Sequence, residues 1–111
     1  MVPIRSLGER HRERIEAHLL ALDLQDRYLR FGYAANDEQI RRYAGQLQFE
    51  RDEVFGIFNR KLELIAMAHL AFLPAEPGAP AGAEFGVSVL ATAPGRGYGS
   101  RLLDRAVVHA R

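Results

Sequence analysis

Three glycines at alternate positions, Gly95, Gly97 and Gly99, lie within the stretch Ala93–Ser100. This stretch follows a run with the composition of a strand, Glu84–Leu90, and precedes apolar residues at helical spacing. The apolar stripe of that expected helix is Leu102, Leu103, Ala106, Val107 and Ala110. A glycine-rich turn between a strand and a helix exposes backbone N–H groups at the positive end of the helix dipole. The stretch therefore predicts an anion site, most naturally for phosphate; the alternative is a turn without a ligand.

Two other glycine signatures do not fit this stretch. The phosphate loop of nucleotide hydrolases needs a Gly-Lys-Ser/Thr triplet, which the sequence does not contain. The dinucleotide fingerprint needs Gly-x-Gly-x-x-Gly/Ala and an acidic residue about 20 positions further on. Its third glycine position is Ser100 when counted from Gly95 and Leu102 when counted from Gly97. Neither nucleotide hydrolysis nor dinucleotide binding is therefore expected.

The stretch resembles motif A of the GNAT family of N-acetyltransferases, Gln/Arg-x-x-Gly-x-Gly/Ala. Gly97 and Gly99 match the two glycines, but Pro94 stands at the first position and offers neither a side-chain donor nor an N–H. Arg96 is then expected to carry more of the charge on the phosphate. The resemblance implies acetyl-CoA as cosubstrate and no metal, with its pyrophosphate on Gly95, Arg96, Gly97, Tyr98, Gly99 and Ser100.

The same resemblance implies an α/β (α+β) GNAT-like fold, a mixed, mostly antiparallel sheet flanked by helices. Residues 1–111 are expected to form a single domain that is truncated after the motif A helix, with the C-terminal part of the family's fold missing. The segment Arg27–Phe31 is similar to one in bacterial protein-lysine acetyltransferases. Its alternative interpretation is a set of aromatic and leucine anchors with solvated arginines.

Periodicity and capping signals predict the order strand, helix, helix, strand, strand, strand, helix. Capping boxes are expected at Ser6 with Glu9 and at Asn36 with Gln39, and Asp23–Phe31 is expected to be helical or irregular. The strands are Val2–Leu7, Glu53–Phe58, Leu64–Phe72 and Glu84–Leu90, with a loop at Pro74–Gly82. The run Leu64–Phe72 lacks alternation, which places it in the middle of the sheet with helices on both faces.

Acetyl transfer to an amine needs a neutral amine, a polarised thioester carbonyl and a stabilised thiolate. The family resemblance implies that the backbone N–H groups of Val87, Ser88 and Val89 polarise the carbonyl, on a strand that a bulge splays from its neighbour. Glu84 on that strand is the candidate base, directly or through water, and its alternative is an edge carboxylate without a catalytic part. No acid for the thiolate is identified among the tyrosines Tyr28, Tyr33, Tyr43 and Tyr98.

Composition excludes several classes of function. The formal net charge is +1, so the basic surface of a nucleic-acid binder is not expected. Without cysteine the chain has no disulfide or thiolate metal site, and its four histidines show no ligand spacing; His18, on an apolar helical stripe, is expected to be packed. No run is long and apolar enough for a signal peptide or membrane span, which predicts a cytoplasmic protein.

Three classes of function remain: an N-acetyltransferase acting on a protein lysine, a protein N-terminus or a small amine; a non-catalytic CoA-binding or acyl-CoA-binding module; and an interaction domain. The first is preferred. Because Glu84–Leu90 would form an uncovered edge and the final helix would be only partly covered, a homodimer or larger assembly is expected.

Overall fold

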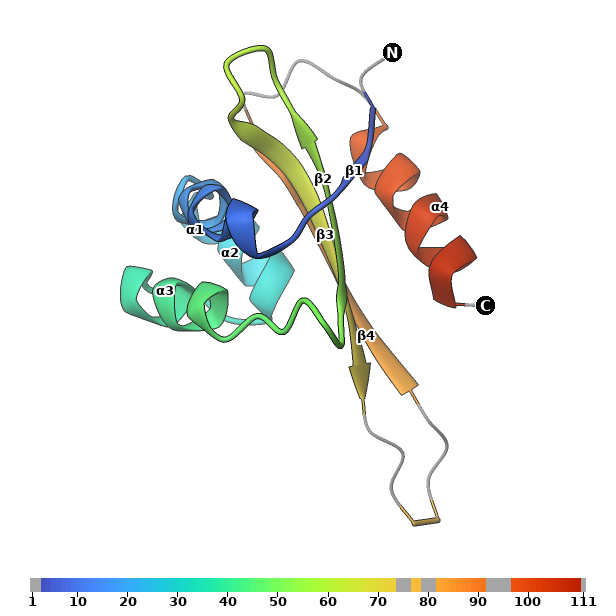
Figure 1. Ribbon diagram of the computed structural model, residues 1–111. Helices are drawn as coiled ribbons and strands as arrows, with labels where there is room; N and C mark the ends of the chain where they lie inside the picture. Colours follow the sequence, from blue (N-terminus) through green and yellow to red (C-terminus); the bar gives the residue numbers. More distant parts are fainter. Residues whose placement is uncertain (1–2, 74–76, 79–81, 92–96, 111) are drawn as a thin grey trace.

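The computed structural model describes residues 3–73, 77–78, 82–91 and 97–110. One four-stranded antiparallel sheet, in the order β1-β2-β3-β4, separates three helices on one face from a single helix on the other (Figure 1). The elements are β1 Arg5–Ser6, α1 Arg12–Leu20, α2 Leu24–Phe31, α3 Asp37–Gly45, β2 Glu53–Phe58, β3 Leu64–Leu73, β4 Gly82–Val89 and α4 Tyr98–Ala110. A 3-10 turn, Glu9–His11, precedes α1.

The N-terminal segment differs from its prediction. The Leu7 N–H donates to the Val54 carbonyl, so the chain stays extended beyond Ser6. The capping box expected at Ser6 with Glu9 is therefore wrong: Gly8 is the cap of the 3-10 turn, and its N–H donates to His11 Nδ1 at 3.1 Å.

Three helices, not two, separate β1 from β2. The Asp23 side chain caps α2 by accepting from the Asp26 N–H at 2.8 Å. Gly32 ends this helix with a φ of 83°, a left-handed conformation that glycine adopts without steric cost. The capping box at Asn36 with Gln39 is confirmed at the start of α3.

Arg27 holds this helical layer together. The interpretation of Arg27–Phe31 as leucine and aromatic anchors with solvated arginines is wrong for Arg27, Tyr28 and Leu29, although Phe31 does pack against the core. Arg27 is buried, whereas Tyr28 and Leu29 are exposed. The Arg27 guanidinium donates to the carbonyls of Leu20, Leu22 and Ala35 and pairs with Asp37 at 2.9 Å. These contacts join the end of α1 to the start of α3, because the freed carbonyls at helix ends need donors.

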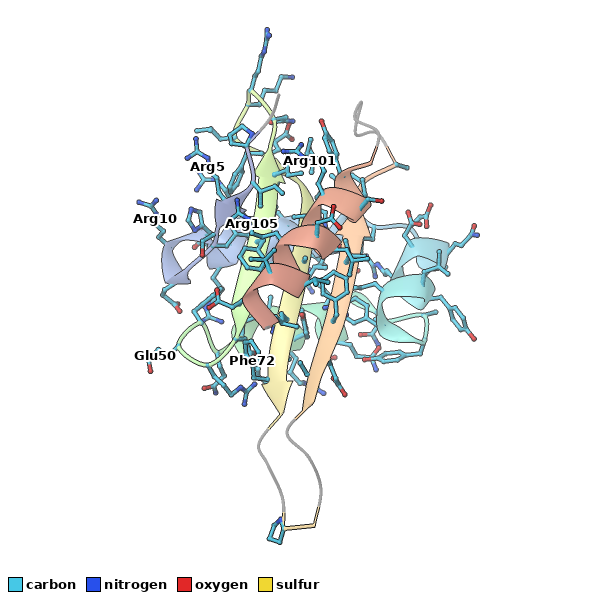
Figure 2. The ribbon with its side chains drawn as sticks, turned by 90° about the vertical axis from the view of Figure 1, so that its right-hand side faces the viewer. Arg5, Arg10, Glu50, Phe72, Arg101 and Arg105 are labelled. Atoms are coloured by element: carbon cyan, nitrogen blue, oxygen red, sulfur yellow. The ribbon has the colours of Figure 1, made fainter. Side chains whose placement is uncertain are left out.

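Strand β3 lies in the middle of the sheet, as its unbroken apolar run predicted, and carries apolar clusters on both faces. Under α1 to α3 the core comprises Leu7, Ile15, Leu19, Leu22, Ala35, Ile40, Leu47, Val54, Leu64 and Met67. Under α4 it comprises Phe55, Ile57, Ile65, Ala66, Ala68, Leu70, Tyr98, Leu102 and Ala106. Figure 2 shows α4 crossing the sheet on this second face. Burial of both clusters fixes the sheet between its two helical layers.

The stripe predicted on the last helix is buried only in part, and the side chain of its last member, Ala110, lies outside the described part of the chain. Leu102 and Ala106 are covered by the sheet, but Leu103 is 46% exposed and Val107 is 42% exposed. Tyr98, at the start of the helix, replaces them in the buried face.

Candidate functional site

The register between β3 and β4 decides which side chains meet. Residues directly opposite in an antiparallel pair lie on the same face of the sheet. Glu84 is opposite Ala71, Gly86 is opposite His69, and Ser88 is opposite Met67. Since Met67 belongs to the core beneath α1 to α3, this whole row faces those helices. Glu84 and His69 therefore lie diagonally across two neighbouring strands on one face.

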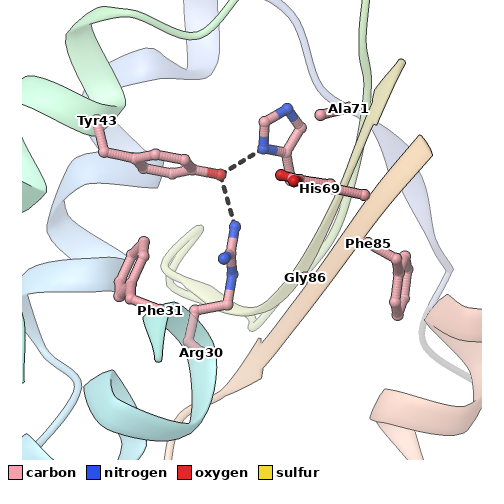
Figure 3. Close-up of a pocket in the computed structure, with 8 residues that line it drawn as sticks. Arg30, Phe31, Tyr43, His69, Ala71, Phe85 and Gly86 are labelled. Carbon is pink, nitrogen blue, oxygen red and sulfur yellow. Dashed lines mark hydrogen bonds between the residues drawn. The ribbon is translucent and has the colours of Figure 1, made fainter. Parts of the chain in front are cut away.

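A pocket of about 460 Å³ opens on this face between β4 and the helices. Its lining comes from α2, α3, β3 and β4 and consists of Arg30, Phe31, Tyr43, His69, Ala71, Glu84, Phe85 and Gly86 (Figure 3). A carboxylate, a guanidinium, a phenol and an imidazole thus share one cavity with aromatic walls. Such a cavity can bind a small polar group and move a proton.

A continuous chain of hydrogen bonds runs from this pocket into the protein. Arg30 Nη2 donates to the Tyr43 hydroxyl at 2.6 Å, and the same hydroxyl is bonded to His69 Nδ1 (Figure 3). On the far side of the ring, His69 Nε2 lies 2.8 Å from Asp52 Oδ2. Because a carboxylate only accepts, Nε2 carries the proton, Nδ1 is the acceptor, and Tyr43 O–H is the donor.

Burial and two neighbouring arginines, Arg30 and Arg51, set the protonation states of the groups in this chain of hydrogen bonds. Burial alone would raise the pKa of Asp52, but hydrogen bonds from Arg51, His69 and the Phe72 N–H hold it below its usual value. Burial lowers the pKa of His69, against the opposing pull of Asp52. Burial also raises the pKa of Tyr43, against the opposing charge of Arg30. At neutral pH this chain of hydrogen bonds therefore contains an ionised Asp52, a neutral His69 imidazole and a neutral Tyr43 phenol.

Arg30 lies close to two aromatic rings and to the backbone of β4. Its guanidinium is 4.8 Å from the ring centre of Phe31 and 5.3 Å from that of Tyr43. A Cβ placed on Gly86 would be 2.3 Å from Arg30 Cζ, so this approach requires glycine at position 86. Within the described residues, Arg30 has no carboxylate within ion-pair distance.

A second buried histidine, His18 of α1, links strands β3 and β4 by hydrogen bonds. His18 of α1 is 2% exposed, and its Nδ1 lies 2.8 Å from the Leu64 carbonyl. Since that carbonyl must accept, Nδ1 carries the proton and Nε2 accepts from the Ser88 hydroxyl at 2.7 Å. Burial lowers the pKa of His18 to about 4. His18 is thus a packed, neutral histidine.

The backbone of β4 presents its N–H groups alternately to β3 and to the open edge. The Leu90 N–H donates to the Ile65 carbonyl at 2.9 Å. By alternation the N–H groups of Val87 and Val89 face the edge that no described strand covers, and that of Ser88 faces β3. The pairing of β3 with β4 is regular to Val89, and the register shift in the described sheet lies in β2, between Ile57 and Phe58.

The N-terminus of α4 presents backbone N–H groups that the helix itself does not use. Gly97 has a φ of 75° and its carbonyl accepts from the Arg101 N–H, which starts the helix there. The N–H groups of Tyr98, Gly99 and Ser100 then have no acceptor within the helix. Among the described residues, no atom lies within 4 Å of a Cβ placed on Gly97 or on Gly99. Pro94, Gly95 and Arg96 lie outside the described residues.

The structure thus brings Glu84 together with four residues that the sequence reasoning missed, Arg30, Tyr43, His69 and Asp52. The signal for two of them was present. His69 interrupts the otherwise apolar run of β3, and Asp52 directly precedes β2. Tyr43 lies at helical spacing with Ile40, Ala44 and Leu47, and within such an apolar stripe its hydroxyl gives no separate signal.

Comparison with known proteins agrees with this geometry. The sequence profile of the acetyltransferase (GNAT) family matches residues 16–111. The chain therefore belongs to the GNAT acetyltransferase family, and its sheet and helices have the acyl-CoA N-acyltransferase fold. Among curated protein sequences none is significantly similar to it.

Solved structures resemble the chain over nearly its whole length. The GNAT domain of S. lividans PAT is 20% identical with a TM-score of 0.71, over 97% of this chain and 64% of that one. An N-acetyltransferase from Staphylococcus aureus Mu50 is 19% identical with a TM-score of 0.69, over 99% of this chain and 66% of that one. A ribosomal-protein-alanine N-acetyltransferase from Brucella melitensis biovar Abortus 2308 is 19% identical with a TM-score of 0.65, over 99% of this chain and 72% of that one. At such low sequence identities, these similarities show a shared fold and nothing further.

Two negative findings apply to the described part of the chain. No three or more His, Cys, Asp or Glu side chains there are grouped so that they could hold a metal ion. No helix in the same residues has the length and apolar character needed to cross a membrane.

Proposed function

We propose that this chain transfers an acetyl group from acetyl-CoA to a primary amine, either a protein lysine, a protein N-terminus or a small amine. The observation that carries the proposal is the double role of β4. Its open edge presents the N–H groups of Val87 and Val89, and its inner face places Glu84 in the pocket. The chain then continues to the α4 N-terminus, where no described atom lies within 4 Å of a Cβ placed on Gly97 or Gly99, and a helix N-terminus favours a phosphate.

Each part has a distinct role in the proposal. The backbone from Gly95 to Ser100 holds the pyrophosphate of acetyl-CoA, with Arg96 supplying positive charge. The edge N–H groups of Val87 and Val89 polarise the thioester carbonyl, while Ser88 holds the strand in place through His18. Glu84 removes a proton from the acceptor ammonium, directly or through water, so that a nitrogen lone pair becomes free to attack.

The direct test of this function is turnover. The full-length protein is incubated with acetyl-CoA and, separately, with a lysine-containing peptide, a peptide with a free N-terminus and a small primary amine. Release of free CoA thiol together with an acetylated amine supports the proposal. Saturable CoA binding without any acetylated product would identify a CoA-binding module instead.

Gly99→Leu is expected to weaken CoA binding at least tenfold, roughly 1.4 kcal/mol, because the side chain would fill the open space beside the helix N-terminus. Gly99 is the better position for this test because it lacks the positive φ of Gly97, so backbone strain is avoided. Gly45→Leu is the matched control, since position 45 also has open space and lies at the far end of α3. Isothermal titration calorimetry that gives the same affinity for both variants would contradict the phosphate site.

Self-association is a separate expectation. Strand β4 is an edge of the described sheet, and α4 exposes Leu103, Val107 and Val108 beside it. An unpaired edge next to exposed apolar side chains favours pairing with a second copy. Sedimentation velocity should therefore show a dimer or larger assembly, and Leu103→Glu should shift it toward monomer. A monomer at all concentrations of the unmodified chain would exclude this association.

A further inference from the structure

The acceptor nitrogen must lose two protons between the ammonium and the amide. The first leaves before attack, and the proposed function assigns it to Glu84. The second leaves after the nitrogen has bonded to the acetyl carbon, when the nitrogen is positively charged and more acidic. A neutral acceptor in the same pocket is sufficient for this second proton.

We propose that Tyr43, His69 and Asp52 form a proton relay that takes the second proton. The nitrogen passes its proton to the Tyr43 oxygen as the Tyr43 O–H proton moves to His69 Nδ1. His69 becomes an imidazolium held between Tyr43 and the Asp52 carboxylate. The inference rests on the proposed function, because the proton comes from the acetylated nitrogen.

The atoms and charges balance. The N–C bond forms, the C–S bond breaks, and its electron pair leaves with sulfur. Of the two protons taken by Glu84 and His69, one joins the thiolate and the other returns to water. The net reaction converts an ammonium and a thioester into an amide, a thiol and one released proton.

The directions of the hydrogen bonds are those that a relay needs. The Tyr43 hydroxyl already donates to His69 Nδ1, and it accepts only from Arg30 among the described residues. A phenol oxygen has a second lone pair, which is left for a substrate N–H. On the other side, Asp52 Oδ2 accepts from His69 Nε2 at 2.8 Å and fixes the tautomer. A proton that enters at Tyr43 therefore meets an imidazole nitrogen prepared to accept it.

Arg30 is the positioning residue of the relay. Its guanidinium donates to Tyr43 at 2.6 Å, packs on the rings of Phe31 and Tyr43, and occupies space that the absence of a Cβ at Gly86 leaves free. A cation at this oxygen stabilises the negative charge that develops while the phenol proton is moving. Arg30 thus assists transfer through Tyr43 without itself exchanging a proton.

The burial of these groups favours a chemical role. Asp52 is 4% exposed and His69 is 9% exposed, in a sheet whose central strand is otherwise apolar. Replacing buried charged pairs by apolar side chains is often neutral or stabilising, so stability alone does not require them. The charged and titratable groups around His69 are Asp52, Arg51, Tyr43, Arg30 and, from the neighbouring strand, Glu84.

The first experiment determines the protonation of the His69 ring nitrogens and does not depend on turnover. Nitrogen-15 NMR of the full-length protein at neutral pH should show His69 protonated at Nε2 and unprotonated at Nδ1. In Tyr43→Phe the Nδ1 signal should move, because its donor is gone. A proton found on Nδ1 in the unmodified protein would overturn the relay, since that nitrogen could then accept nothing.

The second experiment measures kcat as a function of pH, with whichever amine is acetylated fastest in the turnover test. Tyr43→Phe and His69→Gln should each lower kcat about a hundredfold at neutral pH, with KM for acetyl-CoA little changed. The loss should shrink at high pH, where hydroxide takes the proton. The double variant should be no slower than either single variant, because the two residues act as one unit.

Matched controls are Tyr28→Phe, an exposed tyrosine of α2, and His11→Gln, whose ring lies outside the pocket. Both should retain the unmodified rate. Additive losses, or a loss that is the same at every pH, would overturn the relay in an active enzyme and leave the proposed function intact. An unmodified protein that acetylates none of the amines would overturn both.

Discussion

Acidification from neutral pH to pH 4 is expected to lower the free energy of unfolding by about 3 kcal/mol through His18 alone. The pKa of His18 is about 4 in the folded protein, against 6.5 for an unperturbed histidine. Between these values the unfolded chain binds a proton that the folded chain does not. The stabilisation is therefore present above pH 6.5 and is lost as the pH falls toward 4, at about 1.4 kcal/mol per unit of pKa difference.

The measurement is urea unfolding at a series of pH values for the unmodified chain and for His18→Gln. Glutamine can still donate to the Leu64 carbonyl and accept from Ser88, but it does not titrate. The variant should lose about 3 kcal/mol less than the unmodified chain over this range, and other acid-sensitive groups cancel in the comparison. Parallel pH dependences for the two proteins would show that His18 is not the source of acid lability.

Glu84→Gln is expected to lower the rate of acetyl transfer about a hundredfold while leaving the affinity for acetyl-CoA nearly unchanged. The carboxylate lies in the pocket that we propose for the acceptor, whereas the proposed phosphate site lies at the start of α4, at Tyr98. An amide of the same shape cannot take a proton from an ammonium. The loss should become smaller at high pH, where the amine is already neutral.

Steady-state kinetics across pH 6 to 10, with CoA binding measured separately, tests the role of Glu84. Glu13→Gln is the matched control, because Glu13 is an exposed glutamate of α1. Its rate should equal that of the unmodified protein. If Glu84→Gln were equally active, the proton would have to leave to water instead, and Glu84 would be an edge carboxylate without a catalytic part.

The fold could be predicted from the sequence wherever one local pattern decides the structure. Strand β2 has the predicted bounds, Glu53–Phe58, because turn residues delimit it on its C-terminal side and its apolar composition fits a buried strand. The sequence does not decide between helix and irregular structure at Asp23–Phe31, because the exposed face of α2 carries Tyr28 and Leu29, which obscure the helical period. Its cap at Asp23 and its ending at Gly32 were the more reliable local signals.

The pocket was only partly predictable. Glu84 was identified because it lies on the strand that leads to the glycine stretch. Its neighbours were missed because the contacts that define them span long separations: Tyr43 and His69 are 26 residues apart, and Asp52 and His69 are 17 apart. Such partners are brought together by the sheet register and by the packing of α3, and neither can be read from local periodicity.

The close approach of Arg30 to Gly86 couples two positions that are far apart in the chain. A methyl group at position 86 would occupy the space of the guanidinium, whereas it would be accommodated if residue 30 had a short side chain. The coupling runs in one direction: a methyl group at 86 forces the guanidinium away from its place beside Tyr43, whereas a shorter side chain at 30 meets no obstacle at Gly86. Glycine at 86 is therefore needed only while residue 30 is an arginine that reaches Tyr43.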